Sequence, residues 1–198
     1  MPGFEPKVLP FPRPEPGGLA ARSDDELMEL AAAGLREAFA ALVARHERRV
    51  RSFCAKWDGA RSEDLAQEAF LRLWQARARY RPDGQFAVYL FTIVRNVCRN
   101  ARRGFFRRER VLQDAPAANE PSHRAEQLDA LLRRERTERV HRELRGLSPK
   151  LREAVLLRFG EGLSYAEVGA IVDAPEATVR SRVFLGLRAL RARLEVSA

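Results

Sequence analysis

The chain has 198 residues and a formal net charge of +9, from 36 lysine and arginine residues against 27 aspartate and glutamate residues. This length allows two small domains or one medium-sized domain, and the positive charge points to a polyanionic partner. The sequence contains no apolar run long enough to span a bilayer, and its proline-rich start lacks the apolar core of a signal peptide. We therefore expect a cytoplasmic protein that does not insert into membranes.

The first part of the chain divides into a tail and a helical domain. Residues 1–22 hold six of the eleven prolines and show no periodicity, which predicts a disordered tail. From Ser23 onward, apolar residues recur at three- and four-residue spacing, which predicts helices. Breaks at Asp58 and Gly84 interrupt this pattern. We therefore predict a first helical domain over residues 23–110.

The second part begins with a loss of periodicity. Residues 111–123 contain two prolines and small polar residues, which predicts a flexible linker. Helical periodicity resumes over residues 124–198 and predicts a small bundle of about four helices. Within it, Pro149 is expected to open a helix, capped by Ser148, that runs to Phe159. No segment alternates with period two, so the expected fold is all-α: two small helical domains joined by a flexible linker.

The end of the second domain carries the strongest local pattern. Ser164 can cap a helix with its hydroxyl, and Glu167, three positions on, completes a capping box. Pro175 is expected to open a second helix. The apolar stripe of that helix is Val179, Val183, Leu187, Leu190 and Leu194. Its remaining surface includes Thr178, Ser181, Arg182, Leu185 and Arg188. This pattern indicates a helix-turn-helix whose second helix can enter a DNA major groove.

The helix expected from Ser62 to Ala78 has two faces. Its core face is Leu65, Ala66, Ala69, Phe70 and Leu73, and its other face is Asp64, Gln67, Glu68 and Leu71. A leucine surrounded by carboxylates and an amide suits a protein partner better than DNA. Taken alone, the pattern fits a solvated face with one exposed leucine better, because single exposed leucines are common on protein surfaces.

The helix expected to start at Phe86 ends in a strongly basic segment. Residues 95–110 hold seven arginines and one acidic residue, which favours sequence-independent attraction to phosphates. Asn96 and Asn100 lie four residues apart, where their amides can bond unpaired bases. Aromatic residues beside cations can stack on such bases. We assign Trp74, Phe86 and Phe91 to the core, whereas Tyr80 and Tyr89 fit either role.

Cysteine and histidine give no sign of a catalytic or metal site. Cys54 and Cys98 are isolated in apolar helical patterns, which is typical of small buried hydrophobes. The three histidines are scattered among charged residues, without ligand spacing. We expect no metal, no cofactor and no enzymatic activity.

Several separate segments resemble one family. The segments are Ser62–Trp74, Phe86–Asn100, and Leu147–Phe159 followed by the helix-turn-helix. Together they are similar to an extracytoplasmic-function (group 4) sigma factor of the sigma-70 family. In that family the first segment grips the clamp helices of the largest catalytic RNA polymerase subunit. The second opens and reads the −10 promoter element, and the third, with the helix-turn-helix, reads the −35 element.

The resemblance implies a set of site residues and partners. Contacts to core RNA polymerase would come from Asp64, Gln67, Glu68 and Leu71. Contacts to the −10 element would come from Arg95, Asn96, Arg99 and Asn100. Contacts to the −35 element would come from Thr178, Arg180, Ser181, Arg182, Leu185 and Arg188. The implied partners are core RNA polymerase, promoter DNA and an anti-sigma factor, and the free protein would be a monomer whose two modules are held apart by a tether.

One position departs from the family pattern. Family members often carry a basic residue where Leu185 stands. A leucine cannot pair with guanine or phosphate, but it can pack against a thymine methyl group. We therefore expect an altered −35 sequence.

Two other classes of protein fit less well. A stand-alone helix-turn-helix regulator would need a dimer face and a sensing domain, and residues 25–105 would go unexplained. A nucleic-acid enzyme would need clustered carboxylates or a nucleophile–base pair, whereas the acidic residues are scattered over helix faces.

Overall fold

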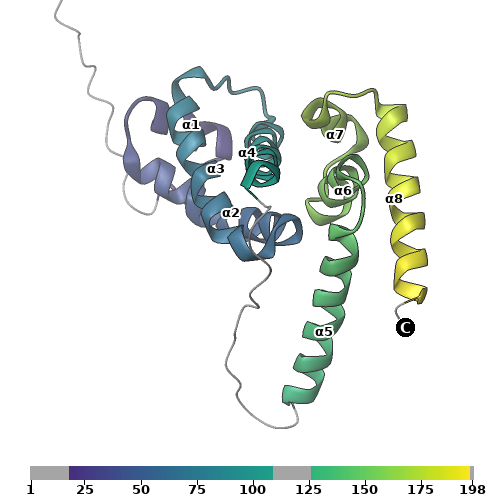
Figure 1. Cartoon of the computed structure of the whole chain (residues 1–198). Helices are drawn as coiled ribbons and strands as arrows, with labels where there is room; N and C mark the ends of the chain where they lie inside the picture. Colours follow the sequence, from purple (N-terminus) through teal and green to yellow (C-terminus); the bar gives the residue numbers. More distant parts are fainter. Residues whose placement is uncertain (1–17, 109–125, 197–198) are drawn as a thin grey trace, which may run out of the picture.

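A computed structural model of the chain describes residues 18–108 and 126–196 (Figure 1). Throughout these two ranges the regular elements are helices, so the predicted all-α fold with two helical segments is confirmed. Helices α1–α4 form one group and α5–α8 the other. The predicted linker 111–123 and most of the predicted tail 1–22 lie outside the described residues.

The first domain contains four α-helices. They are α1 (Asp24–Ala32), α2 (Arg36–Trp57), α3 (Ser62–Ala76) and α4 (Phe86–Arg108). Ser23 starts α1 with a capping box completed by Glu26, and α2 ends before Asp58, where the sequence predicted a break. Short 3-10 turns before and after α3 complete the chain path to α4.

The core of the first domain forms around α2. This helix contacts α1, α3 and α4, and Phe53, Leu73 and Leu90 are fully buried among them. The indole N–H of Trp57 donates to the backbone carbonyl of Cys98 at 3.1 Å, which joins the end of α2 to α4. Burial of these large apolar side chains is the main force that holds the helices together.

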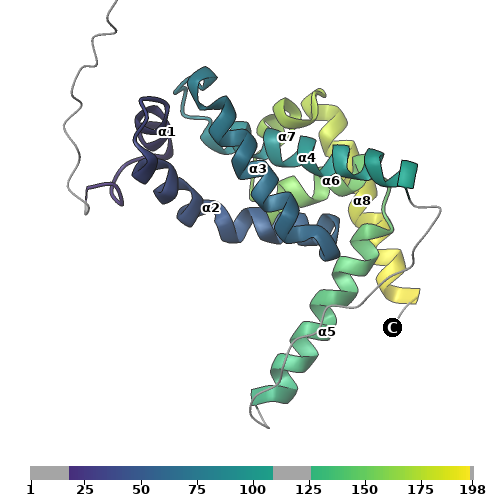
Figure 2. The same cartoon turned by 60° about the vertical axis from the view of Figure 1, so that its left-hand side comes forward.

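The second domain contains α5 (Glu126–Arg145), α6 (Pro149–Val155), α7 (Tyr165–Val172) and α8 (Glu176–Val196). The helix expected to run to Phe159 is shorter: α6 ends at Val155 and a π-helical turn continues to Gly160. Pro149 occupies the first turn of α6 as predicted, but the side chain of Ser148 makes no cap hydrogen bond. The N-terminal part of α5 extends away from both helix groups (Figure 2).

Helix α8 packs on α6 along a stripe that differs from the predicted one. Val179 and Val183 are buried as expected, but Leu187 is 38% exposed. Gly186 occupies the position against α6 that was predicted for Leu187, and a Cβ added at Gly186 would lie 2.6 Å from a methyl group of Val155. The missing side chain lets α8 approach α6 closely.

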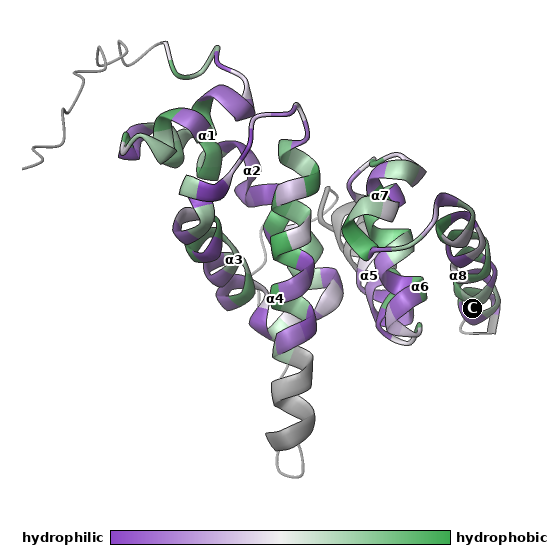
Figure 3. Cartoon of the chain, turned by 90° about the horizontal axis from the view of Figure 1, so that it is seen from above, coloured by the Kyte–Doolittle hydropathy of each residue, from purple (hydrophilic) through white to green (hydrophobic). Residues whose placement is uncertain are grey.

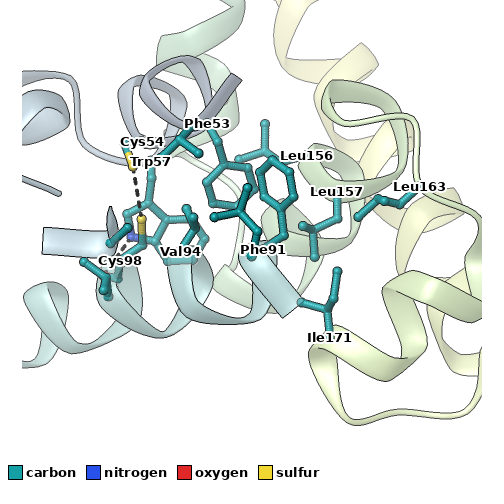
Figure 4. Close-up of a cluster of buried hydrophobic side chains, with 14 of the residues drawn as sticks. Phe53, Cys54, Trp57, Phe91, Val94, Cys98, Leu156, Leu157, Leu163 and Ile171 are labelled. Atoms are coloured by element: carbon teal, nitrogen blue, oxygen red, sulfur yellow. Dashed lines mark hydrogen bonds between the residues drawn. The ribbon is translucent and has the colours of Figure 1, made fainter. Parts of the chain in front are cut away.

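The two domains are in direct contact through α4. Seen from above, α4 lies between α1–α3 and the helices α6 and α7 (Figure 3), and it contacts α7. Phe91 on α4 lies in an apolar cluster with Phe53 of its own domain and with Leu157 and Ile171 of the second domain (Figure 4). This contact differs from the expectation of two modules held apart by a tether.

Candidate functional site

The polar face of α3 is arranged as the sequence predicted. Asp64 and Gln67 are exposed, and Leu71 is 51% exposed. Glu68 is half-buried and accepts a hydrogen bond from Arg72 Nε at 2.6 Å. The opposite side of α3 is buried against α2 and α4, so this face lies on the surface of the protein.

Two amides stand out on the surface of α4. Asn96 and Asn100 are exposed one helical turn apart, and neither side chain has a hydrogen-bond partner among the described residues. Val97 and Cys98, which lie between them in the sequence, are buried, so the two amides lie on the side of α4 that faces away from the core. The side chains of residues 102–108 in the basic segment lie outside the described residues.

Arg95 occupies a different environment from its neighbour Asn96. Its guanidinium is buried and donates from Nε to Glu153 Oε2 at 2.9 Å and from Nη1 to the carbonyl of Ile171 at 3.2 Å. Arg99 is half-buried with its Nε 3.6 Å from Glu153 Oε1. Sequence reasoning placed Arg95 on a DNA-facing surface, whereas in this structure it faces the second domain. The partner residue lies 58 positions away, and no local signal could have identified it.

The aromatic residues near α4 are engaged within the protein. Phe86 and Phe91 are buried, as predicted. Trp74 is half-buried, with Arg77 3.8 Å from its ring centroid. The hydroxyl of Tyr80 donates to Asp25, and that of Tyr89 donates to the carbonyl of Ala76 at 3.3 Å. Burial, with help from Asp25, holds the pKa of Tyr80 above its usual value. Both tyrosines therefore have structural contacts.

The helix-turn-helix forms as predicted. The Ser164 hydroxyl accepts from the backbone of Glu167 at 3.2 Å, and the Glu167 carboxylate accepts from the backbone of Ser164 at 2.7 Å. These bonds lower the pKa of Glu167. Asp173 ends α7 in the left-handed conformation, with φ of 54°. Gly169 permits the tight turn, since a Cβ there would lie 2.8 Å from the carbonyl oxygen of Ala174.

The outer surface of α8 carries the predicted −35 residues. Those that are exposed are Arg180, Ser181, Leu185 and Arg188, and those that are half-buried are Thr178 and Arg182. Leu185 is 42% exposed and Phe184, beside it, is 65% exposed. Phe184 was not predicted. The face therefore mixes cations with apolar side chains.

Cys54 and Cys98 are buried, as predicted, but two contacts between polar groups of the first domain were not predicted. The Cys54 and Cys98 sulfur atoms lie 3.9 Å apart between α2 and α4 (Figure 4), although the two residues are isolated in sequence. His46 is buried, with its Nε2 2.8 Å from Asp24 Oδ2. Burial lowers its pKa, although the Asp24 carboxylate opposes that shift. In the part of the chain that the structure describes, no cluster of acidic, cysteine or histidine residues could hold a metal ion.

The chain is similar to proteins of a known family. Models of sigma-70 region 2 and sigma-70 region 4 match residues 42–108 and 137–190. The RNA polymerase sigma-H factor of Pseudomonas aeruginosa is 30% identical over 190 residues, which cover 87% of this chain and 94% of that protein. The chain belongs to the sigma-70 family, as an extracytoplasmic-function sigma factor. The sigma factor CarQ of Myxococcus xanthus is 36% identical over 169 residues, covering 80% of this chain and 90% of that one.

Solved structures agree with this assignment. CnrH, in complex with the cytosolic domain of CnrY, matches with a TM-score of 0.68 at 25% identity and covers 88% of this chain and 99% of its own. The sigma factor RpoE of Bartonella quintana, in complex with the anti-sigma factor NepR, has the same fold with a TM-score of 0.64 at 23% identity, covering 81% of this sigma factor and 98% of its own chain. This sigma factor is thus a non-enzymatic subunit that serves transcription initiation by RNA polymerase. None of its described helices is long and apolar enough to cross a membrane.

Proposed function

We propose that this sigma factor reads promoters with two separate surfaces, the exposed amides of α4 for the −10 element and the outer face of α8 for the −35 element. The observation that carries the proposal is the pair Asn96 and Asn100, exposed and without partners among the described residues. An amide both donates and accepts hydrogen bonds, so it can recognise the edge of an unpaired base. Arg99, and Arg95 when it is released from Glu153, would bind the neighbouring phosphates.

The second surface suits duplex DNA. Helix α8 begins at the turn of the helix-turn-helix, and a helix in that position enters the major groove with its N-terminal residues against base edges. Ser181 and Leu185 are exposed on this helix, and their short or apolar side chains can distinguish bases. Arg182 and Arg188 are placed to contact phosphates, which fix the register of the helix on the duplex.

The third surface is the polar face of α3. We assign Asp64, Gln67, Glu68 and Leu71 to the contact with core RNA polymerase. An exposed leucine inside a polar surround has the composition of a protein interface, in which a small apolar centre is enclosed by polar groups. The carboxylates of Asp64 and Glu68 give this surface a negative charge, so it is poorly suited to DNA.

The regulatory partner follows from a relative. CnrH was captured with the cytosolic domain of another protein, and its fold covers most of this chain. RpoE of Bartonella quintana, which has the same fold, was solved in complex with the anti-sigma factor NepR. We propose that this sigma factor also binds an anti-sigma factor, that it acts in the cytoplasm where polymerase and chromosome meet, and that it is monomeric when free.

The test separates the two promoter surfaces. Asn96→Ala in the holoenzyme should reduce transcription from a linear duplex promoter by about tenfold, the value of one good base contact. Binding of the free protein to an isolated −35 duplex should not change. Gln85→Ala, which removes an exposed amide just before α4, is the matched control and should have no effect in either assay. Equal losses in both assays for Asn96→Ala would contradict the proposed division of work.

A further inference from the structure

The two cysteines of the chain form a close pair inside the first domain. Cys54 belongs to α2 and Cys98 to α4, and both side chains are fully buried. Their sulfur atoms lie 3.9 Å apart, beside the side chains of Trp57 and Val94 (Figure 4). The sequence holds no other cysteine, so a disulfide within one chain can form only between these two residues.

The packing of α2 on α4 holds the two thiols close together. The indole N–H of Trp57, one turn after Cys54, donates to the backbone carbonyl of Cys98 at 3.1 Å. Trp57 in turn stacks on Phe53, with ring centroids 6.4 Å apart. A disulfide has a sulfur–sulfur distance of about 2.05 Å, so each sulfur atom has to move by roughly 1 Å to form one. Rotation about the Cα–Cβ bonds of the two cysteines can move the sulfur atoms by that amount.

Oxidation of a single thiol at this place would harm the fold. A hydroperoxide converts a thiol to a sulfenic acid, and further hydroperoxide converts that group to a sulfinic acid, which is charged at neutral pH. A charge without a partner among the apolar side chains between α2 and α4 would be strongly destabilising. A disulfide carries no charge and no polar hydrogen, so it is compatible with the same surroundings.

The second thiol leads the reaction to that uncharged product. One thiol sulfur attacks the outer oxygen of the hydroperoxide, which breaks the O–O bond, forms the sulfenic acid and releases an alcohol. The other thiol sulfur, 3.9 Å away, then attacks the sulfenic sulfur, forms the S–S bond and releases water. Two thiols and one hydroperoxide thus give one disulfide, one alcohol and one water. The hydroperoxide takes up the two electrons that the sulfur atoms lose.

Both thiols react slowly in the closed fold. The contact with Cys54, together with burial, raises the pKa of the Cys98 thiol above its ordinary value. The thiolate, which is the reactive form, is therefore scarce at neutral pH, and neither sulfur is exposed. Oxidation thus requires transient local opening of α4 from α2. The pair is suited to protecting the core during lasting oxidation rather than to rapid sensing of an oxidant.

We propose that Cys54 and Cys98 are a site of oxidative modification, at which a hydroperoxide joins α2 to α4 by a disulfide and so keeps the first domain folded under oxidising conditions. The bond ties together positions 44 residues apart, which restricts the unfolded chain and stabilises the fold. Asn96 and Asn100, on either side of Cys98 in the sequence, face away from the bond, so the oxidised protein keeps the surface assigned to the −10 element. Only this last point rests on the proposed function.

The first test identifies the product. The full chain is treated with tert-butyl hydroperoxide, unfolded in a thiol-blocking reagent, and analysed by mass spectrometry and peptide mapping. Cys54 and Cys98 should together lose two hydrogen atoms, and the chain should stay monomeric on a non-reducing gel. The folded oxidised protein should melt at least about 10 °C above the reduced protein, because the bond restricts the unfolded chain. Oxygen added at either cysteine, a disulfide-linked dimer, unmodified thiols or an unchanged melting temperature would overturn the proposal.

The second test measures protection. Cys54→Ala leaves Cys98 without a second thiol, and each protein is compared with its own untreated sample in run-off transcription after the hydroperoxide is removed and core enzyme is added. The wild type should keep most of its activity. Cys54→Ala should gain oxygen at Cys98 and lose activity by about tenfold or more, because a buried sulfinate unfolds the domain. The matched control is the double variant Cys54→Ala and Cys98→Ala, which has no thiol and should not respond to the treatment.

The outcomes separate the disulfide from the promoter assignment. If the wild type forms the disulfide but loses its activity while the thiol-free control keeps it, the protective role is overturned. If Cys54→Ala resists the treatment as well as the wild type does, the second thiol is not needed and the proposal fails. If the reduced holoenzyme does not need Asn96, the promoter assignment fails, whereas the disulfide and its effect on the melting temperature stand.

Discussion

Arg180 is held between a ring and a carboxylate at the start of α8: its guanidinium carbon lies 4.4 Å from the ring centroid of Tyr165, and its Nε donates to Glu176 Oε1 at 3.1 Å. Glu176 belongs to the first turn of the proposed recognition helix. An arginine assigned to DNA is therefore already paired inside the protein, and its carboxylate partner would repel a phosphate at the same place.

This relationship predicts the effect of Glu176→Gln. The variant frees the Arg180 guanidinium and removes a negative charge, so binding of the free protein to a −35 duplex should strengthen evenly across sequences. The slope of log affinity against log salt should steepen by about 0.9, the value of one further phosphate contact. Glu195→Gln, which breaks the Arg191 pair at the other end of α8, is the matched control. An unchanged slope for Glu176→Gln would show that Arg180 does not reach DNA.

The polar face of α3 yields a second prediction. Replacing Gln67 and Leu71 together by alanine should weaken binding to core RNA polymerase by about tenfold, because a central apolar contact is lost. The free energy of unfolding should change by less than about 0.5 kcal/mol, since both side chains are exposed. Phe159→Ala removes another exposed apolar side chain, 58% exposed in the second domain, and should weaken binding less. Normal competition by the double variant would place the core-binding surface elsewhere.

The recognition helix yields a third prediction. Leu185→Arg should shift the preference at one −35 position toward guanine by about 1–3 kcal/mol, the usual value of a bidentate arginine contact. Leu187→Arg adds the same charge at another exposed leucine of α8 and should strengthen binding without changing the sequence preference. Binding-site selection with both variants measures this. An unchanged −35 preference for Leu185→Arg would mean that Leu185 faces solvent or protein.

The buried His46 gives a pH prediction. Burial holds its pKa below the ordinary value of about 6.5. As the pH falls, His46 therefore takes up a proton at a higher pH in the unfolded chain than in the folded chain. The contribution of neutral His46 to the free energy of unfolding is therefore complete above about pH 6.5, the ordinary pKa of histidine, and declines as the pH falls below it. Urea unfolding at pH 7.5 and 5.5 should show a larger loss for the wild type than for His46→Gln, which can still bond Asp24. His141, whose pKa burial also lowers, is present in both proteins and cancels in the comparison. Parallel losses would show that His46 protonates equally in both states.

Local features of the fold were predictable from the sequence. The capping box of Ser164 and Glu167 depends on residues three apart, and the structure contains it. The end of α2 at Asp58 and the two faces of α3 follow from helix periodicity and from turn-forming residues. These signals are local, so one sequence is enough to find them.

Contacts between distant residues were not predictable. Periodicity could not decide whether Gly186 or Leu187 faces α6, because both lie near the edge of the stripe and close packing favoured the glycine. The approach of Cys54 to Cys98 depends on how α2 crosses α4. The pairing of Arg95 with Glu153 depends on how the two domains dock. The sequence neighbours of Arg95 are asparagines, and such a pattern predicts a DNA contact when the other domain is not considered.

The promoter-reading role of this sigma factor is best measured by run-off transcription on genomic fragments with purified core RNA polymerase, with and without this protein. We expect discrete transcripts only when the protein is present, each start preceded by a shared pair of −35 and −10 sequences. Asn96→Ala should abolish most of each transcript, and Gln85→Ala should leave it intact. Transcripts that do not depend on the protein, or starts that share a −35 sequence without any common −10 sequence, would show that it does not read promoters with both surfaces.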